Sequence, residues 1–461
     1  MTRTIETDVL VIGAGMAGLT AATRTLDRGR SVVVVEKAEA VGGSARYAGY
    51  AWTAPTRAVM DEVNPDGDPA LRHALVDGFA GAVEWIRALG VHCGEPVPVL
   101  RYGIGHQFDT NQYIDECRRR ITAAAELFTG TETLQLLTRD NEVTGARVRR
   151  PDGAEIDIHS RAVVLATGGF QADGELVAEY IHPQAPDMQV RSNPASAGAG
   201  LRLAESAGAA TGSPRSGFYG HLVPTGVPFR DPADFVALSL YYSEHALLFN
   251  LDNQRFTDET LGDHLTAMRL VEQPQARGLL VADERVYREW VLGSYVEGAV
   301  AVDKFDLTRR RSGRCGTAET LEDFAYLPAE WGYDGAAIAE QIRAVNAAGD
   351  AVTPARTYDA HPLDRGPYYL IETCPALTFP FHGIRIDAAA RVLSTAGNPI
   401  EGLFAAGSDI GGLYHHAYAG GIAPALVFGL TAADTAALTT DSSAAPDRDR
   451  YAAPGGSRYR G

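Results

Sequence analysis

One short stretch near the start of the chain constrains its fold more than any other. Residues 8–18 read Asp-Val-Leu-Val-Ile-Gly-Ala-Gly-Met-Ala-Gly, an apolar run followed by three spaced glycines. The run predicts a parallel strand buried on both faces, and the glycines predict a tight turn into a helix. Gly13 permits the turn, Gly15 lets the backbone approach a pyrophosphate, and Gly18 lets the helix pack closely on the sheet.

A second strand supports this interpretation. The valine run from Ser31 to Val35 ends at Glu36, and an acid at about this spacing accepts the ribose hydroxyls of an adenosine. The alternative is a glycine turn of another α/β fold, which the agreement of strand, turn, helix and acid disfavours. The predicted nucleotide contacts of this unit are Gly13, Ala14, Gly15, Met16, Ala17, Gly18, Glu36 and Lys37.

Composition limits the classes of protein to which this chain can belong. Its 461 residues suit two or three domains. A net charge of −17 argues against nucleic-acid partners and anionic membrane surfaces. The first strand leaves no room for a signal peptide, and we expect no membrane-spanning segment and a cytoplasmic location. The four cysteines show no CxxC spacing, so we expect reduced thiols and no metal site.

Later glycine-rich turns should return the chain to the same ligand. Gly42, Gly43 and Ser44 follow the second strand, where paired glycines let a loop run against a flat ligand. The apolar run 161–170 stops at two glycines and should end beside the nucleotide. A helix from about residue 423 follows Gly420 and Gly421. The contacts predicted from these segments are Gly42, Gly43, Ser44, Ala166, Thr167, Gly168, Gly421, Ile422 and Ala423.

The middle of the chain differs from both ends. Residues 69–89 still carry an amphipathic helix pattern, and residues 132–150 alternate like paired strands around Asp140 and Asn141. Residues 215–350 instead hold many aromatics and histidines and few valine runs. We therefore predict an α/β nucleotide domain in two pieces (1–215 and 353–440), an inserted domain (216–352), and a disordered tail (441–461).

The ordered set of motifs resembles a known group of enzymes. The set comprises the glycine turn with Glu36, then 42–44, 166–170, 255–259, 366–369 and 402–407. Together they resemble the FAD-dependent fumarate reductase and succinate dehydrogenase flavoprotein superfamily. The similarity is greatest to tricarballylate-dehydrogenase-like and 3-ketosteroid Δ1-dehydrogenase-like members. It implies a discontinuous Rossmann-like FAD-binding domain with an inserted α+β capping domain.

The resemblance also implies a cofactor and a chemistry. FAD would be held without a covalent link, because no histidine stands at the attachment position of the family. The reaction would move a hydride between flavin N5 and a C–C bond next to a carbonyl or carboxylate. The contacts implied after the last glycine-ended strand are Gly407, Ser408 and Asp409, where the family has a glutamate.

The implied catalytic residues lie where this chain departs from the fumarate reductases. Their substrate-binding arginine falls on Tyr418, whose phenol suits donation to an enolate oxygen, and their relay arginine falls on Asp263. In the cap, Tyr287 is our first candidate for the acid or base and Arg285 the second. His416 is preferred over His415 as a residue facing the substrate. Tyr242, His245 and His264 stay open as alternatives.

Three functions are compatible with these residues. The leading hypothesis is an FAD-dependent α,β-desaturase of a small carbonyl or carboxylate compound. The second is an enone or enoate reductase that runs the reverse reaction. The third is an inactive flavin-fold binding protein. The chain has no CxxCH haem-attachment motif, so the built-in electron input of some relatives is absent, and the electron acceptor or donor is unidentified.

Overall fold

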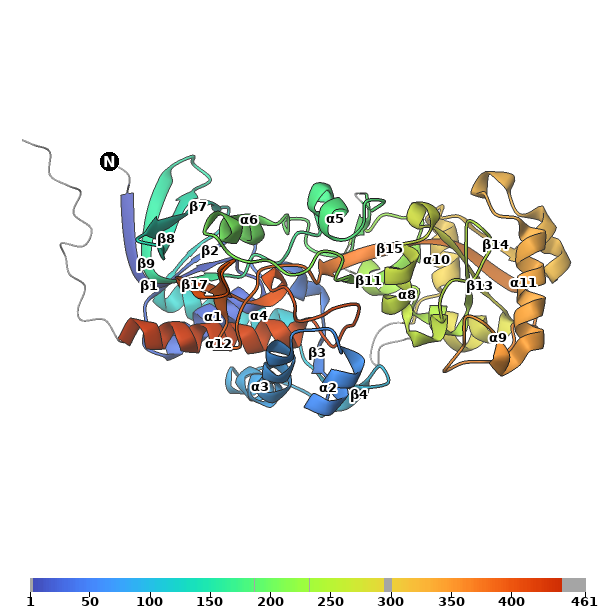
Figure 1. The fold of residues 1–461 in the computed structure, drawn as a ribbon, viewed down its shortest axis with the longest axis horizontal. Helices are drawn as coiled ribbons and strands as arrows, with labels where there is room; N and C mark the ends of the chain where they lie inside the picture. Colours follow the sequence, from blue (N-terminus) through green and yellow to red (C-terminus); the bar gives the residue numbers. More distant parts are fainter. Residues whose placement is uncertain (1–2, 186, 232, 294–300, 442–461) are drawn as a thin grey trace, which may run out of the picture.

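The protein consists of two parts that lie side by side along its longest axis (Figure 1). The computed structural model describes residues 3–185, 187–231, 233–293 and 301–441. One part is built around a mostly parallel sheet and contains both ends of the described chain. The other carries helices α8 to α11 and a second sheet (Figure 1). The predicted Rossmann-like domain with a cap is confirmed.

The first sheet has the strand order β16-β17-β9-β1-β2-β6, and the hairpin β7–β8 extends it through pairing of β8 with β9. Strand β1 lies in parallel between β2 and β9, and β17 runs parallel to β9. The strands are β1 (Arg3–Ile12), β2 (Val32–Val35), β6 (Glu126–Phe128), β7 (Glu132–Arg139), β8 (Glu142–Arg149), β9 (Glu155–Leu165), β16 (Arg391–Leu393) and β17 (Pro399–Ala405). The predicted hairpin is confirmed, with both Asp140 and Asn141 at positive φ.

Helices pack on this sheet and on one another. Helix α1 packs against α12 and α4, and α12 also packs against α3. Asp68 caps α3 by accepting hydrogen bonds from the amides of Ala70 and Leu71. The helices of this part are α1 (Met16–Asp27), α2 (Arg57–Val63), α3 (Pro69–Ala88), α4 (Thr110–Ala124), α5 (Gly174–Tyr180), α6 (Ala199–Ser206) and α12 (Ile422–Asp441). A small sheet of β3 (Tyr50–Thr53), β4 (Val97–Val99) and β5 (Gly103–Gln107) joins them.

Helix α12 corrects one expectation from the sequence. Its window Ile422–Thr439 is long and apolar enough to cross a membrane by length and composition. However, 61% of that window is buried inside the protein, where the helix packs on α1 and α3. A helix that is apolar on all sides because neighbours surround it is typical of a protein core.

The second part forms the cap. Its six-stranded sheet has the order β10-β15-β13-β12, with β11 and β14 also paired to β15. The strands are β10 (Gln189–Val190), β11 (Phe218–Pro224), β12 (Leu247–Asn250), β13 (Gly278–Ala282), β14 (Cys315–Ala318) and β15 (Tyr368–Pro380). Because β10 and β15 belong to this sheet, the cap extends beyond the predicted range 216–352. The helices are α7 (Asp234–Ala237), α8 (Asp263–Leu270), α9 (Glu284–Val286), α10 (Lys304–Arg310) and α11 (Gly335–Ala348).

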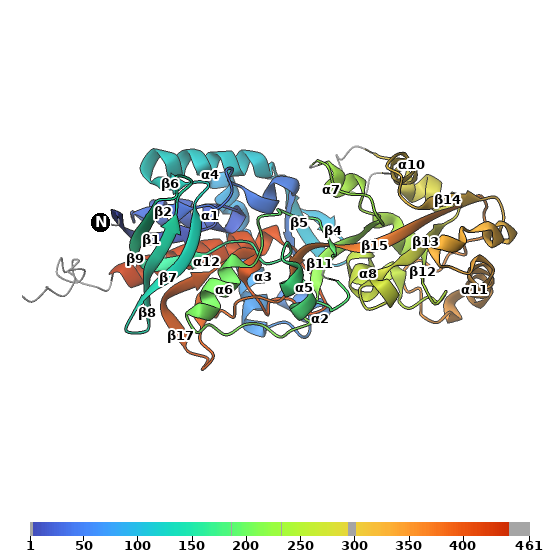
Figure 2. The same cartoon turned by 90° about the horizontal axis from the view of Figure 1, so that it is seen from above.

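Strand β15 connects the two parts. It runs from among the cap strands back toward the nucleotide-binding part, as Figure 2 shows from above. Its last residues Thr378 and Phe379 therefore stand at the junction, where they border a cavity. At the other end of the chain, Asp441 closes α12, and the rest of the predicted disordered tail lies outside the described residues.

Candidate active site

Four chain segments meet at one edge of the central sheet. Gly13 follows β1, Glu36 follows β2, Ala166 follows β9 and Ala406 follows β17. These four strands are parallel, so their carboxyl ends lie together. In open α/β sheets ligands bind at this edge, where the strand connections diverge.

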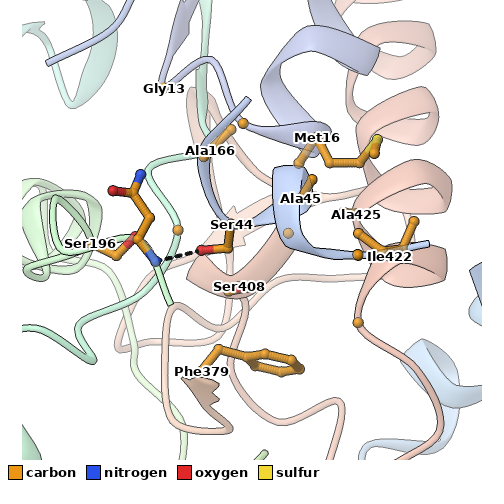
Figure 3. Close-up of a pocket in the computed structure, with 18 of the residues that line it drawn as sticks. Gly13, Met16, Ser44, Ala45, Ala166, Ser196, Phe379, Ser408, Ile422 and Ala425 are labelled. Atoms are coloured by element: carbon orange, nitrogen blue, oxygen red, sulfur yellow. Dashed lines mark hydrogen bonds between the residues drawn. The ribbon is translucent and has the colours of Figure 1, made fainter. Parts of the chain in front are cut away.

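A cavity of about 530 Å³ opens at this edge and extends to the cap. Its volume lies within the range of about 300–1,000 Å³ that is usual for ligand pockets. Figure 3 shows Gly13 and Ala166 at one end and Phe379 at the other, with Ser44 and Ser408 between them. The predicted residues that line the cavity are Gly13, Gly15, Met16, Ala17, Glu36, Lys37, Gly43, Ser44, Ala166, Thr167, Gly168, Gly407, Ser408, Tyr418, Gly421 and Ile422.

The three glycines of the turn have distinct surroundings. Gly13 has a φ of +101°, and a Cβ there would collide with the Ala166 carbonyl oxygen. A Cβ on Gly18 would collide with the Gly13 carbonyl oxygen, so this glycine permits close packing of α1. Beside Gly15, in contrast, a Cβ would meet no protein atom within 4 Å. The space at Gly15 is therefore open to a ligand.

The Glu36 side chain is held in place beside this turn. One carboxylate oxygen accepts the Ala14 amide at 2.7 Å, and the other accepts the Ala38 amide at 2.8 Å. Glu36 also lines the cavity, in the position expected of an acid that binds ribose hydroxyls.

Two helix N-termini face the cavity. Helix α1 begins after Gly15, which has no side chain to cap it, so the first amides of the helix are free for an anionic ligand. Gly421, Ile422 and Ala425, at the start of α12, line another part of the wall. Both helix ends favour negative charge on whatever the cavity holds.

Five residues predicted as cofactor contacts do not line the cavity: Ala14, Gly18, Gly42, Asp409 and Ala423. The Asp409 side chain turns away from it. Its carboxylate accepts hydrogen bonds from the Thr167 amide, the Thr167 hydroxyl at 3.0 Å and the Gly169 amide at 3.1 Å. Burial raises the pKa of Asp409. Asp409 thus shapes the turn after β9, and Ser408 is its neighbour that reaches the cavity.

Tyr418 lies at the cap end of the cavity. Its ring stacks on Tyr219 with centroids 3.8 Å apart, and the edge of Trp52 packs against it at 5.2 Å. Burial raises the pKa of Tyr418, so the phenol keeps its proton at neutral pH. Its hydroxyl also interacts with that of Tyr219, toward which it acts as a hydrogen-bond donor.

The other predicted catalytic residues lie outside the cavity lining. The Tyr287 hydroxyl donates to Asp303 at 2.6 Å, and its ring stacks on Tyr369. Arg285 lies 3.4 Å from the Glu289 carboxylate and 3.6 Å from Asp359. Both side chains thus have partners within the cap, and neither lines the cavity. We therefore correct the assignment of Tyr287 and Arg285 as the acid or base.

His416 is also corrected. It has a φ of +49°, and its amide donates to Ser216 at 2.8 Å, which fixes it in a turn outside the lining. Of the alternatives, His245 pairs with Asp359 at 2.6 Å, and Tyr242 is buried in the cap core. His264 packs near the Tyr418 ring, and burial lowers its pKa to about 4. None of these three lines the cavity.

The sequence interpretation missed several residues at the cap end. Tyr219 and Tyr241 line the cavity, and so does Arg191, which follows β10. Tyr219 and His221 lie two residues apart on β11, so their side chains share one face of the strand. This two-residue spacing is the one feature of the sequence that could have predicted that Tyr219 and His221 lie together.

Arg191 brings a buried positive charge to the wall. Its guanidinium donates to the Phe235 carbonyl, the Ser239 hydroxyl at 3.0 Å and the Thr378 hydroxyl at 3.2 Å. Among the described residues, no carboxylate lies within 4.0 Å of it. Nor do those residues include a group of three His, Cys, Asp or Glu side chains that could hold a metal ion.

Comparison with known proteins identifies the ligand of the cavity. The model of a family described as "FAD binding domain" matches residues 8–422. The chain belongs to this family. It is an FAD-dependent oxidoreductase of the fumarate reductase and succinate dehydrogenase flavoprotein superfamily.

Relatives and solved structures agree with this assignment. The fumarate reductase (cytochrome) of Shewanella frigidimarina is 26% identical over 465 residues, which cover 93% of this chain and 77% of that protein. The urocanate reductase of Eggerthella lenta is 26% identical, with 88% and 70% covered. The 3-ketosteroid Δ1-dehydrogenase structure from Sterolibacterium denitrificans superimposes with a TM-score of 0.76 at 18% identity, covering 94% of this chain and 99% of that one.

The cavity suits FAD. The open space at Gly15 and the uncapped start of α1 would hold the pyrophosphate, and Glu36 would hold the adenosine ribose. Ser44 and Ser408 border the middle of the cavity, and the α12 N-terminus would stabilise negative charge on the flavin.

Proposed function

We propose that the protein catalyses α,β-desaturation of a small molecule at the C–C bond next to its carbonyl or carboxylate. One observation carries this proposal. At the end of the cavity away from the dinucleotide turn, protonated Tyr418 and cationic Arg191 both line the wall, among the aromatic rings of Trp52, Tyr219 and Phe379. Such a wall would accept a flat, conjugated compound and stabilise negative charge on its oxygen.

This arrangement gives the cofactor and the two side chains different roles. FAD, when bound, supplies the acceptor for the hydride. Tyr418 would donate a hydrogen bond to the substrate oxygen as the α-carbon loses its proton, and Arg191 would add positive charge nearby. The described lining residues include no histidine, which supports non-covalent FAD.

The reverse reaction is a second candidate. Relatives include a fumarate reductase, a urocanate reductase and an NADH:acrylate oxidoreductase, and this favours reduction of a conjugated double bond. In that case the electron donor would be a separate protein or a soluble reductant.

An anaerobic experiment with the FAD-loaded protein separates the candidates. Succinate and 4-androstene-3,17-dione are added to the oxidised protein. Fumarate, urocanate and 1,4-androstadiene-3,17-dione are added to the photoreduced protein. Bleaching of the flavin absorbance by a saturated compound supports desaturation. Reoxidation only by the unsaturated compounds overturns that direction, and no response to any of them indicates an inactive flavin fold or a different substrate.

The change Tyr418→Phe tests the donor role. It removes only the hydroxyl, so the aromatic packing on Tyr219 and Trp52 should persist. We expect flavin reduction to slow by about 100-fold, as for loss of one donor to a developing oxyanion, with unchanged FAD content. Stopped-flow absorbance measures the rate. Loss of FAD instead would mean that the tyrosine is structural.

The change Arg191→Met tests the cationic group. A hydrogen bond to a charged group contributes about 1.5–3 kcal/mol, so we expect KM for a carboxylate compound to rise by about 10- to 100-fold. Arg191→Lys keeps the charge and should retain part of the affinity. An unchanged KM for succinate or fumarate in Arg191→Met would show that Arg191 holds only the cap loops.

A further inference from the structure

A buried chain of hydrogen bonds ends at the cavity wall. The Asp263 carboxylate lies 2.5 Å from Nδ1 of His221, and Nε2 of His221 lies 2.8 Å from the Tyr219 hydroxyl. Asp263 is 5% exposed and His221 4% exposed, whereas Tyr219 borders the cavity and stacks on Tyr418. The acid comes from the start of α8 and the other two residues from β11.

The hydrogen bonds between Asp263, His221 and Tyr219 determine in which direction a proton can move along them. Since Asp263 accepts only, His221 must donate from Nδ1, which leaves Nε2 as an acceptor for the Tyr219 hydroxyl. Burial lowers the pKa of His221, so the ring is neutral at pH 7, and burial raises the pKa of Tyr219, so the phenol is protonated. In this resting state His221 can receive the phenolic proton.

We propose that Tyr219 is the catalytic residue that exchanges a proton with the substrate α-carbon, and that His221 and Asp263 are the positioning residues that make it basic. The proposal rests on the proposed function, because it needs a substrate C–H bond next to a carbonyl or carboxylate. It also gives a role to Asp263, which stands where the sequence comparison expected a relay arginine.

Desaturation would use this relay to remove the α-proton of the substrate. The α C–H bond breaks and leaves its electron pair on the substrate as an enolate, while the proton moves to the Tyr219 oxygen. The original Tyr219 proton moves to Nε2 of His221, giving an imidazolium beside the Asp263 carboxylate. The two electrons lost overall leave with the β-hydrogen, for which FAD is the oxidant. Reduction uses the same proton path in reverse.

The Asp263–His221–Tyr219 relay also makes the rate of proton abstraction depend on pH. The charged and titratable groups that face His221 are Asp263, Tyr219, Tyr241, Arg191, Lys304 and His264, whose pKa is lowered by burial to about 4. As pH falls through the lowered pKa of His221, the protonated ring can no longer accept from Tyr219, and proton abstraction stops. Burial lowers the pKa of Lys304 to about 8, so Lys304 stays protonated below pH 7 and a decline of the rate there does not report on it.

Exchange of substrate protons tests the relay apart from oxidation. The holoenzyme is photoreduced anaerobically in D₂O, so that no hydride can be accepted, and deuterium uptake into succinate or 4-androstene-3,17-dione is followed by mass spectrometry. We expect the exchange rate to fall by about 100-fold or more in Tyr219→Phe and by about 10-fold or more in His221→Gln. The exchange in the native protein should also decline below pH 6.5, and this decline should be absent in His221→Gln.

A matched control removes a different buried hydroxyl. Tyr333 packs in the cap core around α11, away from the cavity, so Tyr333→Phe should exchange at the native rate. Native-rate exchange in Tyr219→Phe with intact FAD content would overturn the proposal.

A spectroscopic measurement needs no substrate. The proton between His221 and Asp263 should give a strongly downfield ¹H resonance that disappears in His221→Gln and in Asp263→Asn. If neither succinate nor 4-androstene-3,17-dione exchanges or turns over in the native protein, the proposed function fails for these compounds. The resonance then tests the relay by itself. Its persistence in Asp263→Asn overturns the relay, and its loss supports it.

Discussion

The variant Gly15→Val is expected to fold normally and to purify without FAD. Gly15 has extended backbone angles (φ −78°, ψ −170°), which valine adopts without strain, and a Cβ there meets no protein atom within 4 Å. The added side chain would instead fill the space in which the pyrophosphate approaches α1. We expect FAD affinity to fall by at least about 100-fold, equivalent to about 2.7 kcal/mol.

Flavin absorbance of the purified protein and titration of the apoprotein with FAD measure this effect, and circular dichroism checks the fold. Gly316→Val is the matched control, because Gly316 on β14 also has open space around its Cβ position but lies outside the cavity. Full FAD content in Gly15→Val would show that the dinucleotide turn does not contact the cofactor.

The variant Glu259→Gln is expected to destabilise the cap more than any surface change. The Glu259 side chain is fully buried and pairs with Arg255 at 2.6 Å and with Arg356 at 3.8 Å. It also accepts the Leu248 amide of β12 at 3.0 Å. Removing the charge leaves two buried guanidinium groups without their counter-ion, a change that typically costs about 3–5 kcal/mol.

Hydrogen exchange of the β12 amides and thermal unfolding together show which part of the protein loses stability. We expect β12 to exchange faster while β1 in the nucleotide domain keeps its protection. Glu322→Gln, which removes an exposed partner of Arg343, should leave both unchanged. Equal stability of Glu259→Gln and the native protein would contradict a structural role for this ion pair.

The sequence alone determined the nucleotide half of the site. Strand, glycine turn, helix and Glu36 form one local βαβ unit, so their spacing along the chain already sets their geometry. The same holds for α3 and for the β7–β8 hairpin, whose patterns repeat with the period of their own element. Gly42 and Asp409 were predicted to contact the cofactor but do not line the cavity. A motif predicts the path of the backbone but not which of two neighbouring residues faces the ligand.

The substrate half of the site depends on packing between segments that are far apart in the sequence. Tyr219 and His221 come from β11, Asp263 from α8, Arg191 from the end of β10, and Tyr418 from the turn before α12. No local periodicity links these segments; they meet where β15 carries the cap sheet back to the nucleotide-binding part. Tyr287 matched the expected position along the chain, yet hydrogen bonding to Asp303 and stacking on Tyr369 hold it elsewhere. Side-chain direction depends on such long-range partners, and these appear only when the cap is folded.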